Sequence, residues 1–195
     1  PEKKILINTQ LLFYLMKKSN TACSADSLHD VIKFCYENNK QKDSTEFIII
    51  FLDKISNELN GSIQNEALTK LFQIEIKTHI HNTLNQTDSL RKELHNFLQL
   101  TVASEKVEDQ NKPKKLFDLI MRDYLSKTTI DGTIEKESEF VTFPSVLTIY
   151  FSRNRFDSRK LSSIKLETPI EFPKSLYVDQ FSHRVNDKYR LYAIL

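Results

Sequence analysis

Three side chains near position 43 have the types and spacing to hold a basic, extended peptide. Asp43 and Glu46 stand three residues apart where a strongly apolar stretch begins, and Gln41 comes just before them. Carboxylates in the first turn of a helix can accept backbone N–H groups that lack helical partners, as in a capping box. They could also receive arginine side chains of a bound peptide, with Gln41 exchanging backbone hydrogen bonds. The two interpretations are compatible, and the spacing leaves both open.

The two cysteines give little support to nucleophilic chemistry. Cys23 lies in a polar stretch, residues 19–24. A cysteine nucleophile needs a lowered pKa and a neighbouring base, and no histidine can be assigned as its partner. Cys35 falls on the apolar stripe of an expected helix, so we interpret it as a core residue. Two cysteines form neither a disulfide framework nor a zinc site, and we expect a reducing compartment, cytoplasmic or nuclear.

Histidine and basic side chains offer weaker candidates. His79 and His81 lie two residues apart, on one face of an expected strand. Two ligands are too few for a metal site, so a solvated face is the preferred interpretation and no metal ligand is assigned. Arg153 and Arg155 follow the apolar run 146–151. They fit either a solvated strand end or a strand edge that holds an extended peptide, and the same alternatives apply to Lys165.

The apolar pattern changes its period along the chain and predicts helices first, then strands. Helical spacing covers residues 5–17, 25–38, 44–59 and 64–71, and Gly61 is a suitable stop after the third helix. A further helix is expected from Pro113 to about residue 125. Alternation predicts strands at 72–80, 98–102, 140–143, 146–151, 164–166 and 189–195, with a polar connection at 103–112. This order indicates an α+β fold.

Composition narrows the classes of function. The chain has 195 residues, enough for one domain with a core, and a formal net charge of +2. That balance gives no general attraction to nucleic acid or membrane, and no apolar run has the length of a membrane span. No glycine-rich phosphate loop is present, so no cofactor is expected. Nothing in the pattern specifies an oligomeric state.

Four segments together resemble the catalytic domain of ubiquitin-specific proteases. Residues 41–47 (Gln-Lys-Asp-Ser-Thr-Glu-Phe) are similar to the family's Gln-Gln-Asp-Ala-His-Glu-Phe box. Residues 143–153 (Phe-Pro-Ser-Val-Leu-Thr-Ile-Tyr-Phe-Ser-Arg) resemble its Leu-Pro-Pro-Val-Leu strand and the basic residues that follow. Residues 170–179 and 189–195 resemble the next strands. Each match is weak alone, whereas their order and spacing are fairly specific.

The resemblance extends to one branch, which contains human ubiquitin-specific proteases twenty-five and twenty-eight and the yeast Ubp-two-like enzymes. Residues 12–20 and the Ser152-Arg153 pair are similar to that branch, and the zinc-binding cysteine pairs of many relatives are absent. The implied architecture is a papain-like segment. It has a helical thumb over residues 1–70, followed by antiparallel fingers and palm strands over 71–195 with a helix near 113–125.

The resemblance implies a division of labour between this segment and its flanks. Residues 1–195 would be one internal segment of the domain, with the family's catalytic Cys box before it and the His box after it, so no catalytic residue is assigned here. Gln41, Asp43, Glu46, Arg153 and Lys165 would hold the arginine-rich tail of ubiquitin, the expected partner, free or conjugated to proteins. Asn154 replaces the family's aromatic residue after the palm strand.

Three functions therefore remain open from the sequence. The segment could bind ubiquitin for a cysteine-type deubiquitinase that hydrolyses isopeptide bonds at the ubiquitin C-terminus. It could instead belong to a pseudoprotease that binds ubiquitin without cutting. The third alternative is an unrelated α+β interaction domain in which the matching segments are coincidental.

Overall fold

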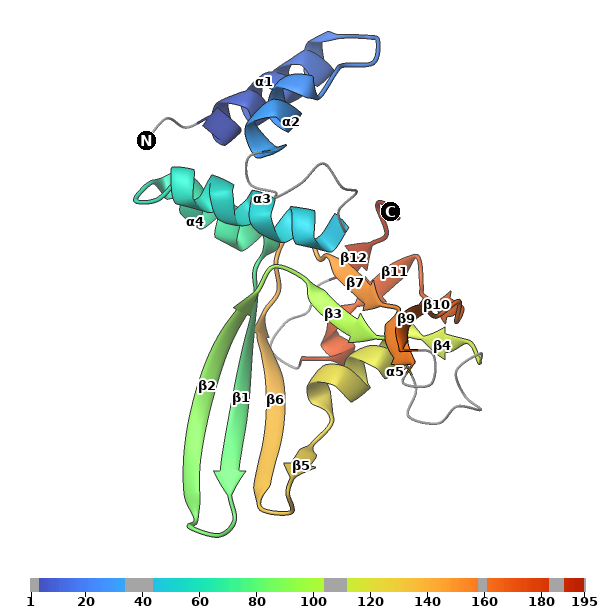
Figure 1. Ribbon diagram of the computed structural model, residues 1–195. Helices are drawn as coiled ribbons and strands as arrows, with labels where there is room; N and C mark the ends of the chain where they lie inside the picture. The colour runs from blue at the N-terminus through green and yellow to red at the C-terminus, as the bar shows by residue number, and fades with distance from the viewer. Residues whose placement is uncertain (1–3, 34–43, 104–111, 158–160, 183–187, 195) are drawn as a thin grey trace. The chain divides into compact units, whose positions relative to one another are not determined.

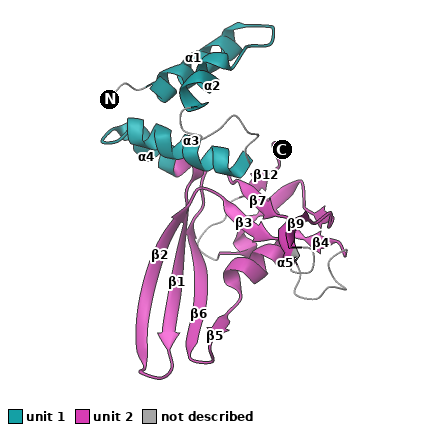
Figure 2. Ribbon diagram, viewed as in Figure 1, with its two compact units in different colours: residues 1–69 teal, residues 70–195 magenta. Residues whose placement is uncertain are grey.

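The chain folds as two compact units, residues 1–69 and 70–195 (Figures 1 and 2). The computed structural model describes residues 4–33, 44–103, 112–157, 161–182 and 188–194. Helices make up the first unit, and strands dominate the second, which confirms the predicted α+β class. Within the described ranges, no helix combines the length and apolar content that a bilayer crossing requires.

Four helices follow one another from the N-terminus, in the order that apolar spacing predicts. They are α1 (Lys4–Lys18), α2 (Asp26–Ile32), α3 (Ser44–Glu58) and α4 (Ile63–Phe72), the last of which contains the boundary between the units. The predictions for 5–17, 44–59 and 64–71 are confirmed to within a residue or two. Gly61 adopts φ +75°, the left-handed conformation of a residue that follows a helix end. The second half of the 25–38 prediction and most of the 103–112 connection lie outside the described residues.

One carboxylate joins two helices of the first unit. Glu58, the last residue of α3, accepts hydrogen bonds from the backbone N–H groups of Ile5 (3.1 Å) and Leu6 (2.7 Å) in the first turn of α1. These N–H groups have no partner inside their own helix, and the helix dipole favours a negative charge there. The small core beneath them contains buried Ile5, Ile32, Ile55 and Leu59. Glu58 thus fixes the start of α1 over this core.

A four-stranded antiparallel sheet forms the long arm of the second unit (Figure 1). Its order is β2 (Thr87–His95), β1 (Ile74–Asn82), β6 (Ile134–Thr142) and β5 (Thr128–Ile130). Burial falls along β1: Ile74 and Ile76 are buried, whereas the residues toward Asn82 are not. One end of the sheet therefore belongs to the core, and the other projects from it.

Short strand pairs and one helix complete the second unit. The pairs are β3 (Leu98–Thr101) with β7 (Ile149–Ser152), β4 (Lys114–Lys115) with β10 (Ile170–Glu171), β8 (Asn154–Asp157) with β9 (Ser162–Lys165), and β11 (Ser175–Tyr177) with β12 (Lys188–Arg190). The helix α5 (Leu116–Ile120) continues into a π-helical turn, η3 (Met121–Leu125). Their shared core contains Ile74, Ile76, Leu98, Leu100, Leu116, Leu119, Ile120, Phe140 and Phe181.

Several sequence-based expectations for this unit need correction. The strand expected at 146–151 is Ile149–Ser152, and the one expected at 140–143 is the end of a longer strand, Ile134–Thr142. The helix begins at Leu116 rather than at Pro113, because Lys114 and Lys115 pair with β10 as a strand. The last strand is β12 (Lys188–Arg190), and residues 191–194 continue without strand pairing. The strand β2 was not expected, because most of its residues are exposed on both faces and its sequence lacks apolar alternation.

Side chains of η3 cover the open edge of β3. Backbone groups of Leu98 and Val102 face β7, so those of Gln99 and Thr101 face away from it. The Tyr124 hydroxyl accepts from the N–H of Gln99 (3.0 Å) and donates to its carbonyl (3.3 Å). Asp123 accepts from the N–H of Thr101 (2.6 Å), and Arg122 donates to the Thr101 carbonyl. This edge is therefore unavailable for pairing with another strand.

Replacement of Glu58 by Ala is expected to destabilise the first unit by about 1–2 kcal/mol, the usual effect of losing a helix N-cap. Urea unfolding followed by circular dichroism at helix wavelengths measures the change. Asp53→Ala is the matched control, because Asp53 on the same helix is exposed and, among the described residues, accepts a hydrogen bond only from the Asn57 side chain. Equal losses in the two variants would contradict a capping role for Glu58.

Replacement of Tyr124 by Phe tests the cover over β3. The pKa of Tyr124 is raised, mainly because the side chain is buried. The negative charges of Asp123 and Glu93 also raise this pKa, whereas the hydrogen bond with the Gln99 backbone lowers it. Above about pH 10 an unfolded tyrosine ionises while the folded one stays neutral, so stability from this group is lost as pH rises. Tyr124→Phe should cost about 1 kcal/mol at pH 8, and this deficit should shrink between pH 10 and 11 in denaturant titrations. A deficit independent of pH would contradict the assignment.

Candidate functional site

The predicted peptide-binding residues divide between the two units. Gln41 and Asp43, and with them the predicted capping box, lie outside the described residues. Glu46 is described: it occupies the first turn of α3 with an exposed side chain. Next to it, Phe47 stacks on Phe51 with ring centroids 5.6 Å apart, which gives this face of the helix an aromatic surface.

Arg153 and Lys165 lie together at the open end of the β8–β9 hairpin, where Arg153 precedes β8 and Lys165 is the last residue of β9. The Arg153 guanidinium donates to the carbonyls of Thr168 (2.7 Å) and Leu166 (3.3 Å), and its own carbonyl accepts from the Leu166 N–H (2.8 Å). Lys165 pairs with Asn154 across the hairpin and is exposed. Arg153 is therefore half-buried and holds the segment that follows β9, whereas Lys165 presents its ammonium group to solvent.

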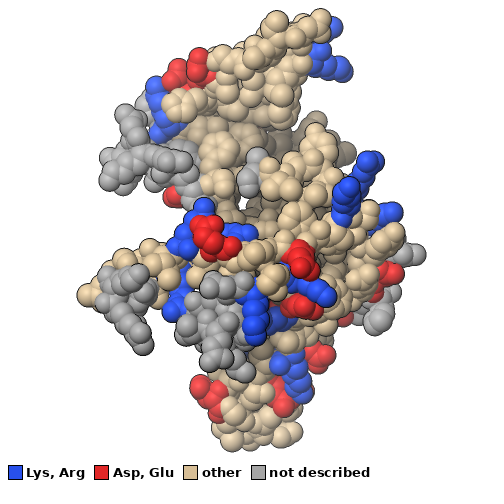
Figure 3. All heavy atoms as spheres, turned by 90° about the vertical axis from the view of Figure 1, so that its right-hand side faces the viewer, with Lys and Arg blue, Asp and Glu red and all other residues tan. Residues whose placement is uncertain are grey.

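The hydrogen bonds of Arg153 are what sequence reasoning missed at this site. Thr168 is 2% exposed, although it stands in a polar stretch beside Pro169. Its carbonyl receives the guanidinium of a residue fifteen positions away, and local patterning carries no signal for such a contact. On the face of the second unit seen in Figure 3, acidic and basic side chains lie next to one another. This face therefore carries no continuous area of one charge, and the local charge changes from one residue to the next.

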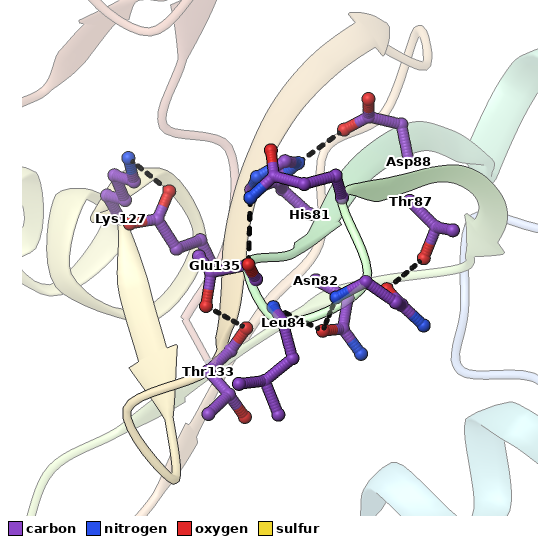
Figure 4. Close-up of polar contacts among 11 residues, drawn as sticks. His81, Asn82, Leu84, Thr87, Asp88, Lys127, Thr133 and Glu135 are labelled. Carbon is purple, nitrogen blue, oxygen red and sulfur yellow. Dashed lines mark hydrogen bonds and ion pairs between the residues drawn. The ribbon is translucent and has the colours of Figure 1, made fainter.

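The histidines predicted on one strand face lie in the half of β1 that is farther from the core, and Figure 4 shows the polar contacts around His81. His79 and His81 are both in β1, and His81 stands opposite Asp88 of β2 and Glu135 of β6. Its Nδ1 lies 2.8 Å from Asp88 Oδ1, and Lys127 pairs with Glu135 at 2.8 Å. Among the described residues, no cluster of three or more metal-binding side chains could hold an ion. These contacts link neighbouring strands.

Cys23 is a free, partly exposed thiol in the loop between α1 and α2. Its sulfur lies 3.8 Å from the Thr21 carbonyl. A backbone carbonyl is not the base that a nucleophilic thiol requires. Cys35 lies outside the described residues.

A polar cavity of about 240 Å³ opens between the long sheet and η3. Four of its charged side chains are paired: Arg122 binds Asp123 and the Thr101 carbonyl, and Arg91 pairs with Glu93 at 2.8 Å. The remaining lining is mostly hydroxyl groups, a lysine and one isoleucine, from Thr78, Ile80, Tyr124, Ser126, Thr128, Lys136 and Ser138. This lining lacks the thiol and imidazole that cysteine-protease chemistry uses.

Comparison with known proteins gives the chain a family. It is 26% identical over 170 residues to ubiquitin carboxyl-terminal hydrolase 7 of Drosophila melanogaster, an alignment that covers 80% of this chain and 14% of that protein. It is 23% identical over 217 aligned positions to ubiquitin C-terminal hydrolase 13 of Arabidopsis thaliana, covering 100% and 19%. The chain thus spans less than a fifth of the length of these curated relatives.

The family model described as ubiquitin carboxyl-terminal hydrolase matches residues 1–195. The match extends over both compact units, including the segments 41–47 and 143–153 on which the sequence resemblance depends. The chain therefore belongs to the ubiquitin carboxyl-terminal hydrolase family.

Proposed function

We propose that this chain is the ubiquitin-binding portion of a cysteine-type deubiquitinase. The observation that carries the proposal is the family match over residues 1–195. The mixed helical and antiparallel architecture is consistent with such a domain. In the proposal, the helical unit supplies the thumb, and residues 71–195 supply fingers and palm of a papain-like arrangement. The assignment to the branch of ubiquitin-specific proteases twenty-five and twenty-eight belongs to the same proposal and is supported by residues 12–20 and Ser152-Arg153.

The segment's task in this proposal is to hold the ubiquitin tail. The tail is rich in arginine, so Asp43 and Glu46 provide charge-assisted hydrogen bonds and Gln41 pairs with its backbone. Lys165 is exposed and can reach a carbonyl or carboxylate of a bound protein. Arg153 has a positioning role, because its guanidinium holds the Leu166 and Thr168 carbonyls beside that lysine.

The chemistry of the parent enzyme requires groups that the described residues do not assemble. A thiolate would attack the carbonyl at the end of ubiquitin, a histidine would transfer the proton to the leaving amine, and water would hydrolyse the acyl-enzyme. We assign the thiolate and the histidine to parts of the parent protein beyond residues 1–195. The present residues then contribute affinity and orientation, which lower the barrier by fixing the scissile bond.

The double variant Asp43→Asn/Glu46→Gln separates tail binding from helix capping. Asparagine and glutamine still cap helices, so stability should change little. Loss of two charge-assisted bonds should weaken ubiquitin binding by about tenfold or more. Titration of fluorescently labelled ubiquitin against the parent protein measures this change.

The control for that titration is Asp53→Asn, which changes an exposed carboxylate farther along the same helix. It should leave the affinity unchanged. Unaltered affinity in the double variant, with normal folding, would show that Asp43 and Glu46 act only as a cap.

The 195-residue chain alone is expected to release no fluorophore from a fluorogenic ubiquitin C-terminal amide, because no thiol in the described residues has a base. Cleavage that disappears in Cys23→Ser would contradict this and make Cys23 the nucleophile. If the parent protein binds ubiquitin yet also fails to cleave the amide, the pseudoprotease alternative is favoured over the enzyme.

A further inference from the structure

The outer edge of β2 is open along its whole length. β2 stands at the end of the sheet order and pairs with β1 (Figure 1). Among the described residues of the second unit, no other strand pairs with it and no side chain hydrogen-bonds its outer edge. Its residues are almost all exposed, including Leu90 at 53% and Leu94 at 62%. The fold covers the edge of β3 with side chains of η3 and keeps the edge strand β5 to three residues. β2 has neither form of protection.

Charged residues on an edge strand usually prevent pairing with another strand. On β2, the order of the charges favours pairing with a second copy of the same strand. Asp88 stands on one side of Leu90, and Arg91, Lys92 and Glu93 follow on the other. If a second copy paired antiparallel with this edge, the two-fold axis would run perpendicular to the sheet. Each face of the sheet would then be continuous across the two copies. At the centre of the paired segment, one residue would lie opposite the identical residue of the second copy.

Only one such centre gives apolar contact and ion pairs over most of β2 without placing a like charge at the axis. Centres at Arg91, Lys92 or Glu93 place that charge against itself, which is destabilising. The Lys92 centre does so although it also brings Leu90 opposite Leu94 and Arg91 opposite Glu93. A centre at Ser89 gives no ion pair, and a centre at Leu94 pairs only residues 93–95 of β2. A centre at Leu90 places Leu90 against its counterpart and Asp88 opposite Lys92 of the second copy, twice by symmetry. The two side chains are 82% and 62% exposed, so both can reach across the interface although they also contact His81 and Glu75.

We propose that the β2 edge is a self-association surface through which two copies of this chain form one continuous antiparallel sheet, centred on Leu90. The paired segment is residues 87–93, or about 24 Å of strand. Each cross-strand pair contributes only about 0.2–1 kcal/mol. Association must also overcome the loss of rotational and translational freedom, so the dimer is weak and forms at high protein concentration.

The first test is sedimentation of the 195-residue chain over a concentration series. Wild type should approach the dimer mass as concentration rises. Leu90→Lys should stay monomeric, because it opposes two ammonium groups at the axis, and Leu94→Lys should still dimerise. The two leucines are matched in exposure and face, and thermal melting should show both variants folded as wild type.

A monomer at every concentration would overturn the proposal and leave the edge for an unrelated extended peptide. Equal loss in both variants would overturn the Leu90 register.

The second test is oxidative cross-linking in a background with Cys23→Ser and Cys35→Ser. Residues directly opposite in antiparallel strands have Cα atoms about 4.5–5.5 Å apart, within disulfide range. Leu90→Cys should therefore form covalent dimers at least tenfold faster than Lys92→Cys or Leu94→Cys. Faster cross-linking at position 92 would overturn this register in favour of one centred on Lys92.

Discussion

The second unit depends on one tyrosine that contacts two sheets. The Tyr124 ring packs on Phe140 of β6 with centroids 5.6 Å apart, and its hydroxyl satisfies both backbone groups of Gln99 in β3. A phenol suits this position because one end is apolar and the other forms hydrogen bonds. The π-helical turn brings Arg122, Asp123 and Tyr124 toward the same region, where an ordinary turn would spread successive side chains further around the axis. The long sheet and the β3–β7 pair are held together at this point.

The local apolar pattern was sufficient to predict the helices and strands that bury one face. It failed for strands that form because of their pairing with a neighbouring strand. The stripe of Leu52 and Ile55 predicted α3, and the alternation of Leu98 and Leu100 predicted β3, because burial itself creates those periods. β2 has no such period. It is a strand because the turn after β1 folds it back onto that strand, in register from Asn82–Thr87 to Ile74–His95. Tertiary pairing of this kind leaves no trace in an exposed sequence.

The candidate site shows the same division between local and distant information. The first-turn position of Glu46 follows from the start of an apolar helix, so the sequence could place it. The contact of Arg153 with the Thr168 carbonyl joins residues that flank a hairpin, and it turns an apparently solvated strand-end arginine into a structural one. Successive side chains of a strand point to opposite faces. Ile164 of β9 is half-buried, so Lys165 next to it points to the other face and is exposed. Residue type alone did not distinguish these two cations.

The interactions that hold the strands of the long sheet together change along its length. At its base, Ile74, Ile76 and Phe140 are buried, and packing fixes the register, since a slip of one residue would expose them. Toward the tip, the described part of the sheet has no buried apolar residue of this kind. There the Thr83 N–H donates to the Thr133 carbonyl at 2.8 Å, and His81–Asp88 and Lys127–Glu135 join neighbouring strands. Polar contacts of this kind contribute less free energy than core packing and tolerate substitution better. The fold therefore constrains the residues at the base, while the residues at the tip and on the β2 edge can change at a smaller cost in stability.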